Sequence, residues 1–251
     1  MPLLWILSDL HEEISPDVVR RFEPPEFDIL VCAGDVSEGD VRGCIDGVAR
    51  VADGRPAVMV LGNHDLYGLP VDRAALVARR IGEPLGVHVV ERSAVEVGGL
   101  RFAGGTLWEN LAPPNEGRAD LSKILSGAVP ALFSPAPTAP YGEPVQVEDQ
   151  RGIRPATFAD IAARRMHTLA AIDASRPDVV VTHYPPTDGD MAYAGGAGIW
   201  IHGHNHTFSR RTTEGVDVIV NAVPSRLFAE RMVVEVSPRP RPTPDAGGAR
   251  P

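Results

Sequence analysis

Short runs of apolar residues recur along the chain, separated by polar or glycine-rich stretches. Most of these runs are rich in β-branched residues and apolar throughout, which is typical of strands covered on both faces of a sheet. The runs that predict strands are Leu3 to Leu7, Asp28 to Ala33, Ala57 to Leu61, Val87 to Val90, Ala94 to Val97, Leu100 to Ala103, Asp178 to Thr182, Ile199 to His202, Val216 to Asn221 and Met232 to Val236.

Three segments between these runs carry apolar residues at helical spacing. Thr157 is expected to cap the third of them at its N-terminus. Their apolar positions are Val41, Ile45, Val48 and Val51; Val71, Ala74, Val77, Ala78 and Ile81; and Phe158, Ile161, Ala162, Leu169 and Ile172. The alternation of strands and helices predicts a layered α/β domain in which two sheets lie between helical layers.

Two stretches lack this periodicity. Residues 112–155 are rich in proline, and we interpret them as an excursion from the core that forms a cap or lid, with anchors such as Leu125 and Phe133 favouring partial order. Residues 237–251 contain Pro, Arg, Gly and Ala without an apolar anchor, which predicts a disordered tail. Residues 1–236 are therefore expected to form a single domain.

Charge narrows the range of partners. The net charge of the chain is -9, and because the predicted tail holds three arginines and one aspartate, the remainder carries -11. Such a surface repels polyanions, so we expect no long nucleic acid and no anionic membrane as a partner. The two cysteines, Cys32 and Cys44, lie within apolar patterns and suit buried thiols in a reducing cytoplasm.

The apolar run near Met1 does not resemble a signal peptide, because it has no basic segment before it and is followed at once by acidic residues. No apolar stretch approaches the length of a transmembrane helix. We therefore expect a soluble protein of the cytoplasm.

Polar motifs follow five of the predicted strands. Carboxylate, amide and imidazole side chains converge where parallel strands end at one edge of a sheet, and together these groups suit first-row divalent metal ions. The motifs are Asp9-Leu10-His11, Gly34-Asp35, Gly62-Asn63-His64-Asp65, Thr182-His183-Tyr184 and Gly203-His204-Asn205-His206.

This ordered set, spanning residues 9 to 206, resembles the calcineurin-like metallophosphoesterase family, and the surroundings of Trp108 and Trp200 resemble a bacterial subgroup of small phosphoesterases. The resemblance implies that family's fold, with two mixed sheets flanked by helices. It also implies two divalent metal ions, with Asp35 as the bridging ligand. One ion would take Asp9, His11 and His206, and the other would take Asn63, His183 and His204.

The implied reaction is hydrolysis of a phosphate ester by a bridging hydroxide that the two ions activate. The resemblance makes His64 the group that assists the leaving oxygen. Two carboxylates could orient its ring, Glu38 and Asp65. We favour Glu38, although relatives carry Asp at that place, and Asp65 could instead hold the loop in place.

Several further residues are less defined by their pattern. Trp108, Tyr67, Tyr184 and Arg226 are candidates for contacting the substrate, with core packing as the equal alternative. His202 could support the last motif or simply pack, whereas His88 and His167 are expected to be structural.

The expected substrate is a small phosphodiester, phosphomonoester or nucleotide. A nuclease for short single strands would need a basic, aromatic-rich groove that the sequence does not indicate, and a scaffold without activity would have lost ligands. The ligand types leave the metal open between manganese, iron, zinc and nickel. The sequence does not indicate the oligomeric state or the physiological substrate.

Overall fold

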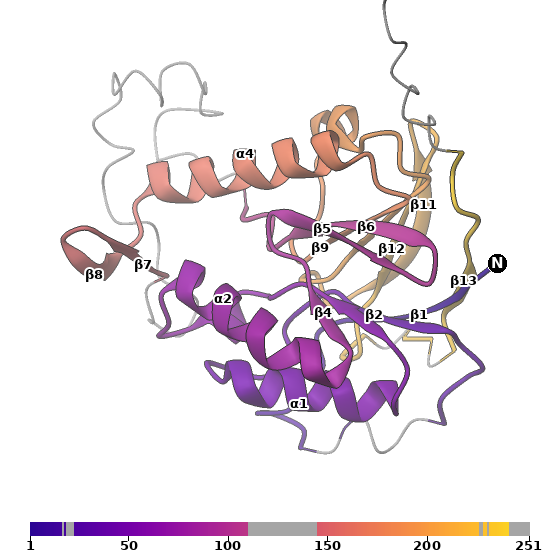
Figure 1. Cartoon of the computed structure of the whole chain (residues 1–251), viewed down its shortest axis with the longest axis horizontal. Helices are drawn as coiled ribbons and strands as arrows, with labels where there is room; N and C mark the ends of the chain where they lie inside the picture. The colour runs from indigo at the N-terminus through magenta and orange to yellow at the C-terminus, as the bar shows by residue number, and fades with distance from the viewer. Residues whose placement is uncertain (17, 19–22, 110–144, 226–227, 230, 241–251) are drawn as a thin grey trace, which may run out of the picture.

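The computed structural model describes residues 1–16, 18, 23–109, 145–225, 228–229 and 231–240 (Figure 1). Two sheets lie face to face between helices, as the sequence predicted, and the helices α1 and α2 lie on the opposite side of the molecule from α4. None of the helices in these ranges is long and apolar enough to cross a membrane.

The first sheet has the order β13-β1-β2-β3-β4. Its strands β1 to β4 run parallel, and β13 pairs antiparallel with β1. The bounds are Leu3–Leu7 for β1, Ile29–Cys32 for β2, Ala57–Met59 for β3, Val87–Val89 for β4 and Val233–Glu235 for β13. The parallel arrangement places the carboxyl ends of β1, β2 and β3 at the same edge.

The second sheet has the order β11-β12-β10-β9-β6-β5. Its four central strands are parallel, and the two outer strands β5 and β11 pair antiparallel with their neighbours. The bounds are Ser93–Val97 for β5, Leu100–Gly105 for β6, Val179–Thr182 for β9, Ile199–His202 for β10, Phe208–Thr213 for β11 and Val216–Asn221 for β12.

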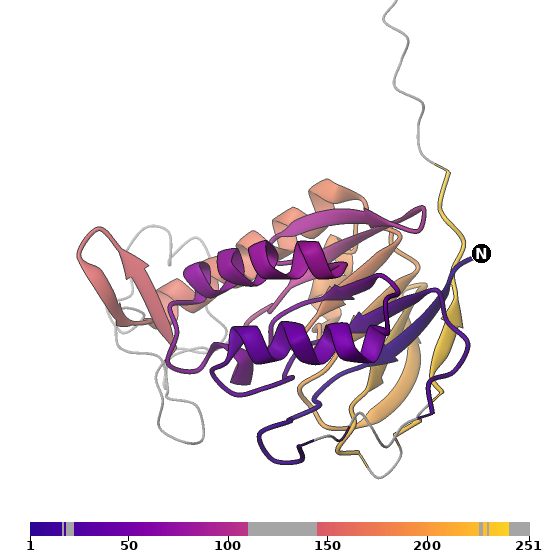
Figure 2. The same cartoon turned by 60° about the horizontal axis from the view of Figure 1, so that its bottom comes forward.

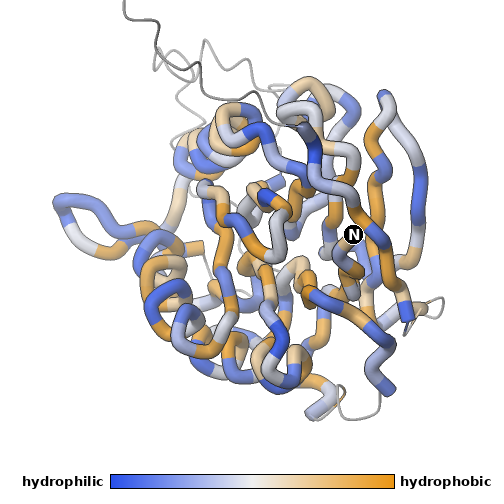
Figure 3. Tube along the Cα trace, turned by 45° about the vertical axis from the view of Figure 1, so that its right-hand side comes forward, coloured by the Kyte–Doolittle hydropathy of each residue, from blue (hydrophilic) through white to orange (hydrophobic). Residues whose placement is uncertain are grey.

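Alternation within the strands assigns their side chains to separate cores. In β1, Leu4 and Ile6 pack against the second sheet, whereas Trp5 and Leu7 pack against α1 (Val41–Ala52) and α2 (Val71–Gly82). Because successive side chains point to opposite faces, both faces of a central strand must be apolar. This explains the continuous apolar runs, and Figure 3 shows hydrophobic segments concentrated in the interior strands.

The helix α4 (Phe158–Ser175) covers the outer face of the second sheet, where Leu169 and Ile172 pack with Trp200. It begins with a capping box, in which Thr157 and Asp160 satisfy each other's main-chain N–H groups. The described chain also contains the short 3-10 helices η2 (His64–Leu66), η3 (Glu83–Leu85) and η5 (Asp188–Tyr193). The predicted N-cap of the third helix is confirmed.

Three of the strands were not expected from the sequence. β11 is an edge strand whose Ser209 to Thr212 are exposed, so its residues are polar and lack an apolar signal. β7 (Gln146–Asp149) and β8 (Gly152–Pro155) form a hairpin that projects beside the N-terminal ends of α2 and α4 (Figure 2). This hairpin belongs to the predicted excursion, whose residues 112–144 lie outside the described ranges.

The expected tail is described only up to Pro240. Residues 237–240 are exposed, and the main-chain N–H of Arg239 donates a hydrogen bond of 2.8 Å to the Asp178 carboxylate. The rest of that expectation concerns residues outside the described chain.

Candidate metal centre

Each sequence motif lies just beyond the carboxyl end of a parallel strand. Strands β1, β2 and β3 lead to Asp9, Asp35 and Asn63, while β9 and β10 of the other sheet lead to His183 and His204. Main-chain and side-chain hydrogen bonds join the two sheets here, including one of 2.8 Å between His183 Nδ1 and the Ala33 carbonyl. The edges of both sheets therefore contribute to one cluster.

The backbone turns sharply at five of the candidate ligands. Asp9, His11, Asp35, His204 and His206 have φ values of 56°, 47°, 55°, 70° and 47°. Positive φ is uncommon outside glycine but is enriched for Asp and His, and it gathers at functional sites.

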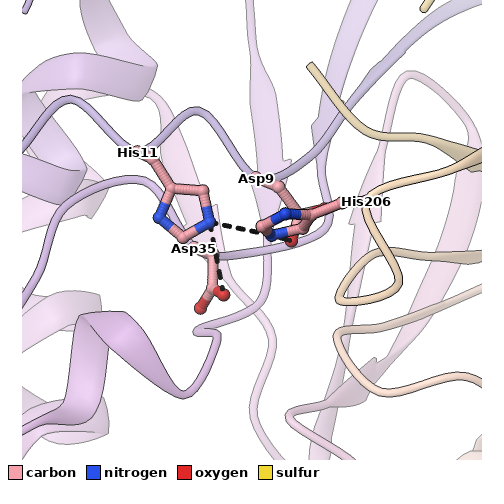
Figure 4. Close-up of side chains that lie close together, drawn as sticks. All are labelled: Asp9, His11, Asp35 and His206. Carbon is pink, nitrogen blue, oxygen red and sulfur yellow. Dashed lines mark hydrogen bonds and ion pairs between the residues drawn. The ribbon is translucent and has the colours of Figure 1, made fainter. Parts of the chain in front are cut away.

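The first group of donors consists of Asp9, His11, Asp35 and His206 (Figure 4). His11 Nε2 lies 3.0 Å from His206 Nε2 and 3.9 Å from Asp35 Oδ2, and His206 Nε2 lies 3.4 Å from Asp9 Oδ1. Asp9 is fully buried and also accepts the main-chain N–H of His204 at 3.0 Å. Three elements of the chain thus direct donor atoms to one place.

The second group consists of Asp35, His183 and His204, with Asn63 between the two imidazoles. Asn63 Oδ1 lies 3.0 Å from His183 Nε2 and 3.1 Å from His204 Nδ1, and His183 Nε2 lies 3.3 Å from Asp35 Oδ2. The two groups share Asp35, the residue that the resemblance makes the bridging ligand, and the assignment of ligands to two ions stays a prediction.

Asp35 is held in place on several sides. It is 1% exposed, and its Oδ1 accepts the main-chain N–H of His64 at 2.9 Å. A Cβ at position 62 would lie 2.0 Å from the same oxygen, so Gly62 is required for this approach. Burial by itself would raise the pKa of Asp35, but the neighbouring His183 and His64 hold it well below its usual range.

The imidazoles of the second group have divergent pKa values. Burial opposes the charged form of His183, but the Asp35 carboxylate overcomes this effect and raises its pKa to about 9. Burial and the charge of His183 lower the pKa of His204 to about 4. In the first group, the hydrogen bond to Asp9 raises the pKa of His206.

The donor set fits divalent metal ions. In each group, imidazole nitrogens and a buried carboxylate come within 4.8 Å of one another, which is close enough for one cation to contact all of them. Such a mixed nitrogen and oxygen set suits a transition metal better than the oxygen-only shell of calcium.

The predicted leaving-group residue, His64, lies beside the first group. Its ring is 4.6 Å from that of His11 in an edge-on arrangement and 4.6 Å from that of Tyr67. His64 Nδ1 lies 3.7 Å from Glu38 Oε2 and equally far from Glu13 Oε1. Glu38, which we favoured as the residue that orients His64, is therefore near the ring, and the Glu13 carboxylate lies at the same distance from the same nitrogen.

Glu13 was not among the residues that the sequence singled out. Its carboxylate contacts His11 Nδ1 at 2.7 Å, and it follows the first motif by two residues. The neighbouring Glu12 and Glu13 look equivalent in the sequence, and only the turn after His11 separates their directions.

Asp65, the alternative partner of His64, lies among main-chain N–H groups of the loops that follow β2 and β3. It is completely buried, and its carboxylate accepts main-chain N–H groups from both strand-end loops and the thiol of Cys44. The four main-chain donors are Gly62, Asp35, Val36 and Ser37, at 2.8, 3.0, 2.7 and 3.1 Å. These contacts tie two loops together, and the contacts shown for this carboxylate do not include the His64 ring.

Three of the four candidate substrate residues lie beside the donor groups. The Tyr184 ring stacks on His204 at 4.1 Å and lies 5.9 Å from that of Trp108, while the Tyr67 hydroxyl accepts from Asn63 Nδ2 at 2.7 Å. Trp108 and Tyr67 are each 5% exposed, so packing is their visible role. Arg226 lies outside the described residues.

His202, whose role the sequence left open, is a buried neighbour of the last motif. Its Nδ1 lies 3.0 Å from the Gly203 carbonyl, and burial lowers its pKa to about 4. The described structure thus shows it packed behind the ligands.

A pocket of about 320 Å³ opens beside His204. It is lined by Glu109, Arg165, Tyr184, Pro185, Pro186, Thr187, His204 and Asn205. The Arg165 guanidinium donates to the carbonyls of Leu107 and Trp108 and pairs with Asp190, so its donors are directed to protein groups.

The family model for calcineurin-like phosphoesterases matches residues 2–208. A search of curated proteins finds no match.

Among solved structures, phosphopantetheinyl hydrolase from Mycobacterium tuberculosis superposes with a TM-score of 0.61 at 18% identity, covering 97% of this chain and 98% of that one. A predicted phosphoesterase from Streptococcus pneumoniae TIGR4 has a TM-score of 0.30 at 13% identity, covering 88% of this chain and 72% of the other. The likeness to phosphopantetheinyl hydrolase shows the fold, and the family match covers every motif of the site. The chain belongs to the calcineurin-like phosphoesterase family of metal-dependent hydrolases.

Proposed function

We propose that this protein hydrolyses a small phosphate ester, a phosphodiester, phosphomonoester or nucleotide, with two divalent metal ions. The observation that carries the proposal is the position of Asp35, whose carboxylate belongs to both donor groups. Asp9, His11 and His206 would complete one set of ligands. Asn63, His183 and His204 would complete the other.

Two bound cations supply an activated water nucleophile and neutralise the charge of the phosphate oxygens. Their identity is open between manganese, iron, zinc and nickel, because all accept mixed imidazole and carboxylate ligands. The residues of the chain then have to bind the ester, exclude competing charge and deliver a proton to the leaving oxygen.

His64 would deliver this proton. It lies beside the first donor group without belonging to the ligand set above, and two carboxylates lie on the Nδ1 side of its ring. A carboxylate at Nδ1 stabilises the protonated imidazole, and the nitrogen across the ring then exchanges the proton with the substrate. Proton donation of this kind accelerates ester cleavage about 10²- to 10⁴-fold.

The pocket beside His204 suits the organic part of a small ester. Tyr184, Pro185 and Pro186 provide apolar surface, and Glu109 adds a negative charge. Since the guanidinium of Arg165 is directed to Asp190 and main-chain carbonyls, the described lining favours an uncharged group over a further phosphate. The acidic chain also opposes long polyanions.

The test is a substrate panel with the metal-loaded protein: a chromogenic diester, a monoester, a cyclic nucleotide, a phosphopantetheinyl ester and linear duplex DNA. We expect turnover of small esters and little cleavage of DNA. Cleavage of the duplex at rates matching the small esters would favour a nuclease instead.

His64→Ala should keep the metal content of the wild type and lose about 10²- to 10⁴-fold in turnover. His167→Ala, which removes an exposed histidine from α4, serves as the matched control. Loss of metal from His64→Ala, or full activity on an ester with a poor leaving group, would contradict the role proposed for His64.

A further inference from the structure

The Glu13 carboxylate lies between two imidazoles that have different tasks in the proposed function. Its Oε1 is 2.7 Å from Nδ1 of His11, a candidate ligand, and 3.7 Å from Nδ1 of His64, the candidate proton donor. The rings of these two histidines contact each other edge-on at 4.6 Å. One carboxylate therefore touches both the metal site and the leaving-group site.

The two nitrogens of His11 face different surroundings. Nε2 is directed to the donor group, near His206 and Asp35, so Nδ1 is the nitrogen that can donate its hydrogen to Glu13. A carboxylate that accepts from the distal N–H of a ligating histidine fixes its tautomer and the direction of its lone pair. This is the geometry that Glu13 provides.

We propose that Glu13 is a positioning residue that sets the orientation of His11 toward its metal ion and holds the His64 ring for proton donation. The proposal rests on the proposed function for its second half, whereas the first half concerns metal binding alone. The His64 contact is longer than a hydrogen bond, and such contacts shorten when a substrate completes the site.

The backbone fixes Glu13 in this place. The His11 carbonyl accepts from the main-chain N–H groups of Ile14 and Ser15, at 2.9 and 3.0 Å, which closes a tight turn around Glu13. The N–H groups of His11 and Glu12 donate in turn to the carbonyls of Asp35 and Val36. The turn is thus attached to the loop that carries the shared ligand.

Two neighbouring carboxylates provide comparisons. Glu38 lies as far from His64 Nδ1 as Glu13 does, but its side chain is 41% exposed against 21% for Glu13, and its described ion pair is with His64 alone. Glu12 points away from the site and pairs with Arg50 at 2.9 Å. Glu13 is therefore better anchored than Glu38 and differs from Glu12 in direction rather than in chemistry.

The experiment compares Glu13→Ala, Glu13→Gln, Glu38→Ala and the control Glu12→Gln. Calorimetric titration of Mn²⁺ or Zn²⁺ into metal-free protein measures metal affinity, and rates on aryl and alkyl phosphate esters measure the dependence on the leaving group. Circular dichroism checks folding of each variant. If Glu13→Ala does not fold, the isosteric Glu13→Gln carries both measurements.

We expect Glu13→Ala to weaken binding of one of the two metal ions about 10- to 100-fold. Its activity should fall more on alkyl than on aryl esters, because a poor leaving group depends more on proton donation. Glu13→Gln keeps an acceptor for His11 but has no charge to offer His64. Its metal affinity should therefore equal that of the wild type, whereas its activity should still fall more on alkyl than on aryl esters. Glu38→Ala should bind both ions normally, and Glu12→Gln should match the wild type.

Unchanged metal affinity in Glu13→Ala would overturn the role toward His11, and a leaving-group dependence equal to that of the wild type would overturn the role toward His64. Wild-type protein that hydrolyses no ester would instead refute the proposed function. The titration would still decide the role toward His11 in that case.

Discussion

The substitution Asp65→Asn isolates the contribution of the buried carboxylate behind the metal site. Its Oδ1 accepts from Val36 N, Ser37 N and Cys44 Sγ, and its Oδ2 accepts from Asp35 N and Gly62 N. An asparagine of the same shape has one oxygen and one NH₂ group. Whichever way it is placed, at least two buried main-chain N–H groups would face another donor.

Two opposing effects determine how much the free energy of unfolding falls in Asp65→Asn. Burial and the charge of Asp35 raise the pKa of Asp65, so removing its charge relieves some repulsion. Each buried donor left without an acceptor costs about 1–3 kcal/mol, and two of them cost about 2–6 kcal/mol. Since five donors already compensate the charge, the lost acceptors dominate, and we expect a net loss of about 3 kcal/mol.

Thermal unfolding of the metal-free protein measures this loss. For a domain of this size, about 3 kcal/mol corresponds to a decrease in Tm of about 6–12 °C. Asp40→Asn is the matched control, because this exposed N-cap accepts from Gly43 N at 2.9 Å and asparagine caps helices equally well. The reasoning fails if the Tm of Asp65→Asn lies within 2 °C of the control, where 2 °C is about the shift for a loss under 1 kcal/mol.

Two further predictions concern the shared ligand and the first turn of α4. Asp35→Asn should bind less metal and lose most of the rise in Tm that metal gives the wild type, because ligands stabilise the fold by mass action; equal metal content and an equal rise in Tm would contradict its shared role. Burial would raise the pKa of Asp160, but hydrogen bonds from Arg154 and Thr157 lower it to about 2, so its stabilisation is complete above about pH 4 and is lost as the pH falls toward 2. Asp160→Asn should therefore lose stability at neutral pH and show a smaller decrease between pH 4 and 2 in unfolding experiments, and a decrease equal to the wild type's would refute this assignment.

The sequence was sufficient for the layers and for the convergence of the ligands. Central strands such as Ile199–His202 are apolar on both faces because both faces are covered, and their polar residues begin where the strand leaves the core. His204 and Asn63 are 141 residues apart in the chain, yet their proximity follows from parallel strands ending at one edge. The order of strands and the polar motifs that follow them therefore predicted the layers and the place where these side chains gather.

Sequence periodicity could not predict features that depend on exposure or on side-chain direction. β11 is solvent-exposed over most of its length, so pairing with β12 and not burial defines it. Glu12 and Glu13 are identical in type, and their different partners follow from the turn closed by the His11 carbonyl. The place of Asp65 likewise depends on the main-chain N–H groups that surround its carboxylate, which a sequence pattern does not show, and the choice of Glu38 as the residue that orients His64 stays a prediction.

Three of the candidate ligands have a left-handed backbone conformation that hydrogen bonds between the loops hold in place. The left-handed region costs a residue other than glycine about 1–3 kcal/mol, and Asp9, His11 and Asp35 all adopt it. Hydrogen bonds between loops supply the restraint: Asp9 N donates to Gly34 O, His11 N to Asp35 O, and Asp35 N to Asp65. Aspartate and histidine tolerate this conformation better than most residues, so the same side chains suit both the turn and the metal. A β-branched residue in place of one of these side chains should therefore lower the stability even of metal-free protein. Asparagine at Asp9 should keep the turn, but it should weaken both the metal site and the contacts that the Asp9 carboxylate makes with His204 N and His206 Nε2.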